Sequence, residues 1–337
     1  IARGSKFSLP FFMEFLTVRA MHLPVRFQPL YQARVWGGRA LGQVFPRTLP
    51  GSDPIGESWE VVDRPEAQSI VRDGPLAGMT LRDALHLRCA DWIGPDWPVT
   101  RPFPILIKWL DCRERLSLQV HPPVEIAASL HGEPKTENWY LASIEGQAGL
   151  ILGLQPGVNR PQFEAALHAD TLEQCVNRYS VQPGDSVLVH SGTVHAIDAG
   201  CLILEIQQNS DTTYRVYDWG RVGLDGKPRK LHVEESMQSI LFDEPPPPIV
   251  RAADKAAVIA DCAEFRIRRV PMKKGAQLSF IAGEQCRLLS IVRGRLRCRG
   301  LDLAPFIAGD NSLLPFAGAY TFEADEDSLA LVTENFS

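Results

Sequence analysis

The sequence predicts a mainly β protein, built from two similar sandwiches with a few short helices at the periphery. The first observation is that most apolar runs are short and lie between Gly, Pro, Asp or Asn, which is typical of strands. These runs include PILIKWL, SVLVHSG, CLILEIQ, CRLLSIV and LALVTEN. The second is a weak internal repeat, and the third is a proline-rich segment that divides the chain. At 337 residues the chain has room for two domains of about 150 residues each.

The composition narrows the class of partner. Hydrophobic residues make up 45% of the chain and charged residues 22%, as in an ordinary globular protein. The formal net charge of −5 provides no global attraction to nucleic acid or to an anionic membrane. No apolar run approaches the roughly 18 residues that a membrane-spanning helix needs. We therefore expect a small-molecule partner, no nucleic acid and no membrane.

The seven cysteines are scattered along the chain without a C-x-x-C pair. An odd, unpatterned set argues against a disulfide framework and against a thiolate metal site, so we expect a reduced, cytoplasmic protein. Residues 1–21 are expected to be an extension or a cloning remnant, with Met21 as the natural start. Their apolar stretch is short and is interrupted by Glu14 and Arg19, which disfavours a signal peptide.

Three segments have helical patterns. Residues 79–93 place Thr80 as an N-cap before apolar residues at helical spacing, and shorter helices are expected within 161–169 and 233–242. The clearest linker contains four consecutive prolines, which hold a chain extended. We therefore expect a first domain over 22–243, a linker at 244–248 and a second domain over 249–337.

The internal repeat compares PGDSVLVHSGTVHAI, residues 183–197, with AGDNSLLPFAGAYTF, residues 308–322. Both copies have Gly-Asp and then a Leu four residues after the Gly. Eleven residues after that Gly, the first copy has His195 and the second has Tyr320. Two unrelated β-turns would also explain the Gly-Asp pairs. Since a matching strand follows each pair, the repeat predicts two similar sandwiches, of which the first alone carries a metal ligand.

The stretch LSLQVHPP, residues 116–123, carries the first candidate ligands. Successive side chains of a strand point to opposite faces. Ser117, Gln119 and His121 therefore share one face, while Leu116, Leu118 and Val120 form the other. One face is predicted to pack in a core, and the other has the residue types of a ligand set.

Two later stretches supply further donors. KTENWYLASI places Lys135 and Glu137 at strand spacing, and SGTVHA brings His195 after a glycine turn. Two imidazoles, a carboxylate and an amide oxygen suit zinc, with manganese, iron, cobalt or nickel as alternatives. A lone histidine on a strand is more often structural, so the prediction depends on the whole set.

The motifs around these residues resemble those of the type I mannose-6-phosphate isomerases, zinc-dependent members of the cupin superfamily. The similar segments are WGG, GESWEV, LSLQVHP, KTENWY, PGDSVLVHSGTVHA and EIQQNSDTTYRVYDWGR. The resemblance extends over roughly residues 27–337 and is to the short bacterial form, which lacks a long helical insertion. It implies two cupin-type jelly rolls, with the metal and the catalytic residues in the first.

The resemblance also implies roles for individual residues. It assigns one Zn²⁺ per chain to Gln119, His121, Glu137 and His195. It makes Arg215 a catalytic residue, places Lys135 beside the glutamate ligand, and puts Ser117, Lys108 and Arg221 near the sugar phosphate. Some short forms lack the glutamine ligand. His190 stands where relatives often have proline, and we expect it to be structural or to lie outside the ligand set.

The implied reaction interconverts mannose 6-phosphate and fructose 6-phosphate by moving a proton between C1 and C2 through an enediol. A base must carry the proton, and cations must stabilise the negative charge that develops. Arg215 and Lys135 offer fixed positive charge. Glu205 is either the base or a partner of a ligating histidine, and the sequence leaves both roles open.

Two other functions fit part of the pattern. A metal-bearing cupin that binds sugar phosphates without turnover would keep the pocket, but it would have no need of Arg215 and Lys135. An iron-dependent cupin oxygenase needs open metal positions, whereas Gln119 would fill one.

The stretch IVRGRLRCRG, residues 291–300, is the last candidate site. On a single strand, Arg293, Arg295, Arg297 and Arg299 would share one face. This face is either an anion site or, as we expect, a solvated face balanced by the acidic stretch EADEDS at residues 323–328.

Overall fold

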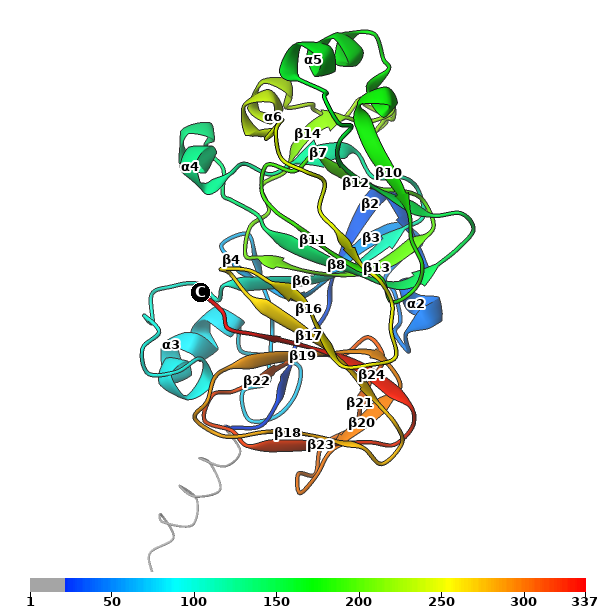
Figure 1. The fold of residues 1–337 in the computed structure, drawn as a ribbon. Coiled ribbons are helices and arrows are strands. Elements are labelled where there is room, and N and C mark those ends of the chain that lie inside the picture. Colours follow the sequence, from blue (N-terminus) through cyan, green and yellow to red (C-terminus); the bar gives the residue numbers. More distant parts are fainter. Residues whose placement is uncertain (1–21) are drawn as a thin grey trace, which may run out of the picture. The chain divides into compact units, whose positions relative to one another are not determined.

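The computed structural model describes residues 22–337, which form two compact units (Figure 1). The smaller unit contains residues 22–28, 70–102 and 272–335, and the larger contains 29–69, 103–271 and 336–337. The two units therefore alternate along the chain, whereas the sequence suggests consecutive domains on either side of 244–248. The expectation for residues 1–21 lies outside the described residues.

The larger unit contains two antiparallel sheets. The strands of the first are β2 (Leu30–Gly38), β3 (Ile55–Val61), β6 (Ile105–Cys112), β8 (Glu137–Ile144), β11 (Ser186–Val189), β13 (Cys201–Gln208) and β15 (Ile249–Val250). Their order is β15-β11-β8-β13-β6-β3-β2. The strands of the second are β7 (Leu118–Val120), β9 (Gly149–Leu154), β10 (Val176–Ser180), β12 (His195–Ile197) and β14 (Tyr214–Tyr217). Their order is β10-β9-β12-β7-β14.

The larger unit also has two short strand pairs and several short helices. The pairs are β4 (Asp63–Arg64) with β5 (Ala67–Gln68), and β16 (Ala257–Asp261) with β17 (Arg266–Met272). The helices are α2 (Leu41–Val44), α4 (Val124–Ala127), α5 (Arg160–His168) and α6 (Val233–Ser239), with 3₁₀ turns at Ala128–Leu130 and Leu172–Cys175. α5 begins with a capping box, in which Asn159 and Gln162 satisfy each other's backbone N–H groups.

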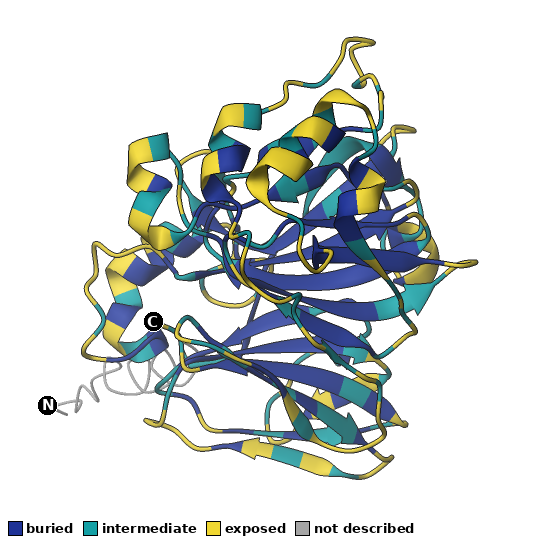
Figure 2. Ribbon diagram, turned by 45° about the horizontal axis from the view of Figure 1, so that its top comes forward, coloured by how far each residue is buried: buried dark blue, intermediate teal, exposed yellow. Residues whose placement is uncertain are grey.

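Two large hydrophobic cores and a smaller cluster around Trp59, Val62 and Leu106 hold the larger unit together. The core between the two sheets contains side chains of β6, β8, β9, β11, β12 and β13, among them Trp139, Leu150 and Ile203. The second core lies between the outer face of β7, β9, β12 and β14 and the helices α5 and α6. Figure 2 shows this division, with buried strands in dark blue and helices that expose one side and bury the other.

The smaller unit contains the first strand of the chain and most of the C-terminal strands. They are β1 (Val25–Arg26), β18 (Gln277–Phe280), β19 (Arg287–Arg293), β20 (Arg295–Cys298), β21 (Phe306–Ile307), β22 (Asn311–Leu314), β23 (Tyr320–Ala324) and β24 (Ser328–Glu334). β1, β22, β19 and β24 are neighbours in one sheet, and β18-β23-β20-β21 form another. The unit also contains α3 (Leu81–Trp92), whose predicted N-cap Thr80 accepts a hydrogen bond from the Asp83 N–H at 3.1 Å.

The internal repeat corresponds to one local structure that occurs in both units. Gly184 and Gly309 have φ values of 92° and 94°, which is the region that glycine tolerates best. The aspartate after each glycine accepts a backbone N–H three residues before it, from Gln182 at 3.0 Å and from Ile307 at 3.1 Å. A strand follows in each case, β11 or β22. The repeated Gly-Asp pair therefore marks the same turn at the start of equivalent strands.

The arginine-rich stretch differs from its prediction in one respect. Gly294 has a φ of 84° and ends β19, so Arg293 does not continue onto β20 and the four arginines do not lie on one strand. Within β20 the prediction is confirmed, because Leu296 and Cys298 are buried and Arg295 and Arg297 are exposed. Acidic partners come from the expected stretch, with Arg297 Nε 3.0 Å from Asp325 and Arg299 hydrogen-bonded to Glu323.

The predicted fold class is confirmed, since the described chain is mainly β with several sheets and few helices. The three predicted helices are present as α3, α5 and α6. No helix in residues 22–337 has the length and apolar character needed to cross a bilayer.

Candidate metal centre and substrate pocket

The two faces of β7 have the environments that alternation predicts. Leu118 and Val120 are fully buried in the core beneath α5 and α6. Gln119 pairs across the sheet with His195 of β12 and with Arg215 of β14. Gln119, His195 and Arg215 therefore lie side by side on neighbouring strands. Alternation directs the polar side chains of β7 away from the face that α5 and α6 cover.

Three of the expected ligands meet in one cluster. His121 follows β7, Glu137 begins β8 and His195 begins β12, and one ligand atom from each lies within 4.8 Å of the others. His121 Nε2 is 3.6 Å from Glu137 Oε2, and His195 Nε2 is 3.4 Å from Glu137 Oε1. All three side chains have 0% exposure. A carboxylate so deeply buried requires nearby cations or a metal.

The unused atoms of this cluster indicate a metal. His121 Nε2 and both carboxylate oxygens of Glu137 are buried and make no hydrogen bond with any residue of the described chain. The opposite ring nitrogens are occupied, since His121 Nδ1 lies 2.8 Å from Thr212 O and His195 Nδ1 lies 2.8 Å from Thr193 O. These carbonyls require protonated Nδ1 atoms, so each neutral ring presents the Nε2 lone pair to Glu137.

The charge states also suit metal binding. Burial and the charge of Lys135 together lower the pKa of His121 to about 3, although Glu137 opposes them. Burial likewise lowers the pKa of His195. Burial raises the pKa of Glu137, but Lys135 and His121 outweigh it and hold that pKa well below the usual range. The cluster at neutral pH is therefore two neutral imidazoles and one carboxylate.

Gln119 lies at the edge of this cluster. Its Nε2 is 3.2 Å from His195 Nε2. An amide group that is rotated by 180° exchanges its N and O positions at almost no steric cost. Rotation would therefore direct the Gln119 oxygen toward the three other donors, as a fourth ligand requires.

Lys135 is held against the same carboxylate. Its Nζ is 2.7 Å from Glu137 Oε2, and its side chain is 4% exposed. Burial alone would lower the pKa of this lysine, but Glu137 and Glu205 outweigh burial and raise it. Lys135 therefore carries a fixed positive charge beside the cluster.

A pocket of about 400 Å³ opens beside Gln119. It is lined by polar and charged side chains and a few apolar ones: Arg34, Trp36, Glu57, Lys108, Leu110, Leu116, Ser117, Gln119, Lys135, Glu205, Asp211, Thr213, Arg215 and Arg229. Six of the predicted site residues are among them, namely Lys108, Ser117, Gln119, Lys135, Glu205 and Arg215. The remaining ligands, His121, Glu137 and His195, are buried behind this lining. The pocket volume suits a small sugar derivative.

Arg221 is the one predicted substrate residue that does not line this pocket. Its guanidinium donates to Arg115 O, and its Nη2 lies 2.6 Å from Asp218 Oδ1. His190 also lies apart from the cluster, as expected. It is exposed and borders a separate hollow that contains the proline segment 245–248.

Glu205 lies between the lysines of the pocket. Trp139 Nε1 donates to Glu205 Oε1 at 3.0 Å, and Lys108 Nζ is 3.5 Å from Oε2. Burial raises the pKa of Glu205, and the nearby Glu137 adds to this effect, although Lys135 opposes it. A carboxyl group with a raised pKa exchanges a proton near neutral pH more readily than an ordinary glutamate does.

Four charged residues of the pocket were missed at the level of sequence, namely Arg34, Glu57, Asp211 and Arg229. Arg34 on β2 and Glu57 on β3 form an ion pair, with Arg34 Nε 2.9 Å and Nη2 3.1 Å from the two Glu57 oxygens. Arg229 comes from the irregular segment after β14. GESWEV was recognised as a motif without a role for its Glu57, and nothing in the spacing marks Arg229.

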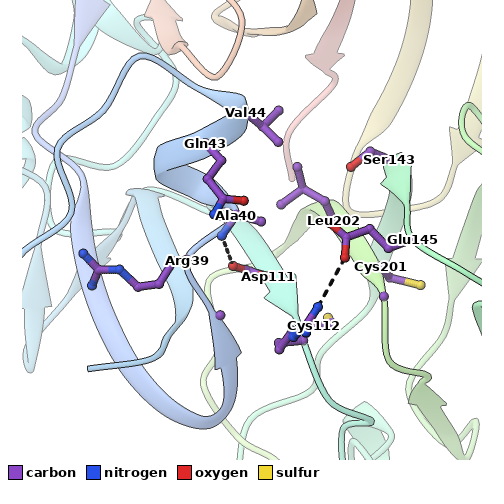
Figure 3. Close-up of a pocket in the computed structure, with 13 residues that line it drawn as sticks. Arg39, Ala40, Gln43, Val44, Asp111, Cys112, Ser143, Glu145, Cys201 and Leu202 are labelled. Atoms are coloured by element: carbon purple, nitrogen blue, oxygen red, sulfur yellow. Dashed lines mark hydrogen bonds and ion pairs between the residues drawn. The ribbon is translucent and has the colours of Figure 1, made fainter. Parts of the chain in front are cut away.

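A second hollow of similar size lies at the other end of β6 and β13 (Figure 3). There the Ala40 N–H donates to Asp111 Oδ2 at 2.6 Å, beside Cys112 and Cys201. Burial raises the pKa values of both thiols, which disfavours the thiolate forms that metals need. This hollow therefore lacks the donor set found beside Gln119.

Known proteins are similar to this chain over most of its length. Residues 25–147 match the model of the phosphomannose isomerase type I catalytic domain. The chain is 38% identical over 309 residues to the probable mannose-6-phosphate isomerase GmuF of Bacillus subtilis, covering 89% of this chain and 96% of that protein. It is 34% identical over 304 residues to the mannose-6-phosphate isomerase ManA of the same organism, covering 87% and 93%.

Solved structures have the same fold. The mannose 6-phosphate isomerase structure from Bacillus subtilis has a TM-score of 0.80 at 27% identity, over 93% of this chain and 99% of that chain. A structure described as mannose 6-phosphate isomerase bound with zinc and yttrium has a TM-score of 0.69 at 16% identity, over 93% and 100%. Identity above 30% along nearly the full length of two relatives establishes that this chain belongs to the type I phosphomannose isomerases, a family of enzymes.

Proposed function

We propose that the chain interconverts mannose 6-phosphate and fructose 6-phosphate as a zinc-dependent aldose–ketose isomerase. The observation that carries this proposal is the buried His121–Glu137–His195 cluster, in which His121 Nε2 and Glu137 Oε1 have no hydrogen bond within residues 22–337 although a polar pocket opens beside the cluster. The names of the similar Bacillus subtilis proteins support the choice of substrate.

The donor set supports one zinc ion per chain. Two imidazole nitrogens, a carboxylate oxygen and an amide oxygen are ligands that zinc accepts in a four-coordinate site. Gln119, His121, Glu137 and His195 would hold it, and Lys135 would limit the net charge of the ligand set. When bound, the metal supplies a Lewis acid that polarises the sugar oxygens.

The side chains of the pocket provide the remaining chemistry. In the forward direction, a base removes the proton from C2 of the open-chain aldose to give an enediolate. A proton passes from O2 to O1, and the base then returns its proton to C1 to give the ketose. We assign the proton transfer to Glu205, because it lines the pocket and its pKa is raised. Arg215 and Lys135 would stabilise the negative charge on the sugar oxygens during the transfer.

The decisive experiment combines metal analysis with an assay for fructose 6-phosphate. Purified protein is expected to contain about one zinc per chain and to convert mannose 6-phosphate. A chelator should remove the metal and the activity together, and added zinc should restore both. Retention of bound sugar phosphate without turnover would favour a binding protein instead, and full activity without metal would refute the zinc site. We also propose a cytoplasmic location, which the seven free cysteines support.

A further inference from the structure

The charged side chains of the pocket are not equally balanced. Arg34 is paired with Glu57, Lys135 with Glu137, and Lys108 with Glu205 at 3.5 Å and Asp211 at 3.7 Å. Each of these cations therefore already has a carboxylate close by. The remaining cations of the pocket are Arg215 and Arg229.

Arg215, Arg221 and Arg229 have one nearby carboxylate among the described residues, that of Asp218. Asp218 Oδ1 is 2.6 Å from Arg221 Nη2 and 3.3 Å from Arg229 Nη1, and Asp218 Oδ2 is buried without a hydrogen bond. Arg215 donates to the carbonyl of Lys230 at 2.7 Å, while its Nε is buried and makes no hydrogen bond in residues 22–337. The guanidinium groups of Arg221 and Arg229 thus share one carboxylate, and Arg215 forms no ion pair within residues 22–337.

The electrostatics of Arg229 show the consequence of this imbalance. Burial and the positive charges of Arg215, Arg221 and Arg34 together lower the pKa of Arg229 to about 10. The carboxylate of Asp218 raises this pKa but does not offset their effect. Burial and the neighbouring arginines lower the pKa of Arg215 in the same way. An anion placed between these two side chains would relieve both effects, and a phosphate group matches the fork of a guanidinium.

Arg221 is less suited to receive that anion. It lies outside the pocket lining, and its guanidinium is committed to the Arg115 carbonyl and to Asp218. Arg229 lines the pocket together with Gln119 and Ser117, so a molecule that reaches the metal ligands can also reach it.

We infer that Arg229 binds the phosphate of the substrate and that Asp218 acts as a positioning residue for Arg229. The inference rests on the proposed function, because it takes the ligand of the pocket to be a sugar phosphate. Arg221 then holds Asp218 in place from outside the pocket.

The test uses the full-length, zinc-loaded protein and two matched variants, Arg229→Met and Arg113→Met. Arg113 is an exposed arginine whose partner is Glu145 on the surface, so its variant controls for the loss of one positive charge. Steady-state kinetics give kcat and KM for mannose 6-phosphate. Calorimetry with inorganic phosphate gives binding without catalysis.

Arg229→Met should raise KM and weaken phosphate binding by about 10- to 100-fold, the effect of losing a charge-assisted hydrogen bond to phosphate. Its kcat should stay within about threefold, since the lost contact binds substrate and transition state alike. Arg113→Met should leave both measurements unchanged. Asp218→Asn should raise KM by a smaller factor than Arg229→Met does.

Changes below about twofold in both KM and phosphate binding for Arg229→Met would overturn the inference. A larger effect of Arg221→Met than of Arg229→Met would transfer the role to Arg221. If Arg229→Met does not fold, Arg229→Lys serves instead, because it keeps the charge and loses the fork, and unchanged phosphate binding in that variant would also refute the assignment. A wild-type protein that binds phosphate without turning over mannose 6-phosphate would refute the proposed function, while the calorimetry would still decide on Arg229.

Discussion

Glu57 offers the sharpest test of the electrostatics of the pocket. Its carboxylate receives two hydrogen bonds from Arg34, at 2.9 and 3.1 Å, and one from Trp59 Nε1 at 2.7 Å. The side chain is 13% exposed. Burial raises its pKa, but Lys108 and Arg34 outweigh burial and lower the pKa from 4.5 to about 2.

The magnitude follows from the linkage between protonation and folding. Each pKa unit corresponds to about 1.4 kcal/mol, so the ionised Glu57 stabilises the folded state by about 3 kcal/mol at neutral pH. Because the folded pKa is the lower one, this contribution is complete above the unfolded value of 4.5. It is lost as the pH falls from 4.5 toward about 2.

Glu57→Gln removes the charge and keeps the shape and part of the hydrogen bonding. We expect the free energy of unfolding to fall by about 2 to 3 kcal/mol at pH 7. The assay is urea denaturation of metal-free protein, which keeps metal loss out of the comparison, at pH 7 and at several values down to pH 3. Glu114→Gln, at an exposed position, is the matched control and should have little effect.

The pH profile decides between charge and packing. The free energy of unfolding should differ less between wild type and Glu57→Gln as the pH falls below about 4.5. The reason is that the wild-type carboxylate then becomes protonated when the chain unfolds. A difference that stays constant with pH, or one below about 0.5 kcal/mol at pH 7, would show that the charge of Glu57 contributes little.

Three further predictions concern other parts of the chain. His121→Ala and His195→Ala should each lose the metal and turnover, whereas His190→Ala should keep near-normal metal content. Metal analysis of the three purified variants checks this expectation, and a metal-free His190→Ala variant would contradict it. Arg215→Ala should retain the metal and the fold but lose most of its kcat, since its proposed role is in the transition state, and a wild-type kcat would remove Arg215 from the mechanism. Ser117→Ala should instead mainly raise KM, because its expected partner is the substrate phosphate. The double variant Arg295→Glu and Arg297→Glu should have kcat and KM within about twofold of the wild-type values, because both side chains are exposed on β20. A folded but inactive variant would make this strand part of the functional surface.

The polar face that carries Gln119 and His121 could be predicted from the sequence because strand alternation is a local property, whereas Glu137 and His195 were assigned to the ligand set through the family resemblance. A period of two fixes which residues of LSLQVHPP share a face, and the apolar alternate residues require the polar ones to point away from the helix-covered core. The repeated Gly-Asp turn and the Thr80 cap were also predictable, since each depends on contacts within a few residues.

The second half of the pocket could not be predicted in this way. Arg221 and Arg229 lie in an irregular segment, where no periodicity relates sequence spacing to direction. Only one of these two arginines faces the pocket, and the choice depends on the positions of Asp218 and the Arg115 carbonyl. Arg115 is more than 100 residues away from Arg221 along the chain. The break at Gly294 is a smaller example, because a glycine in an apparent strand pattern does not reveal whether the chain turns there.

The sequence by itself therefore determined the β class and the alternating faces, which depend on short-range geometry, and its resemblance to a family supplied the candidate metal ligands. The tertiary structure decided which cations enter the pocket, which of them are neutralised, and how the two units share the chain. The physical reason is that charge balance and burial are properties of distant segments brought together, so they have no signature in the spacing of residues along any one segment.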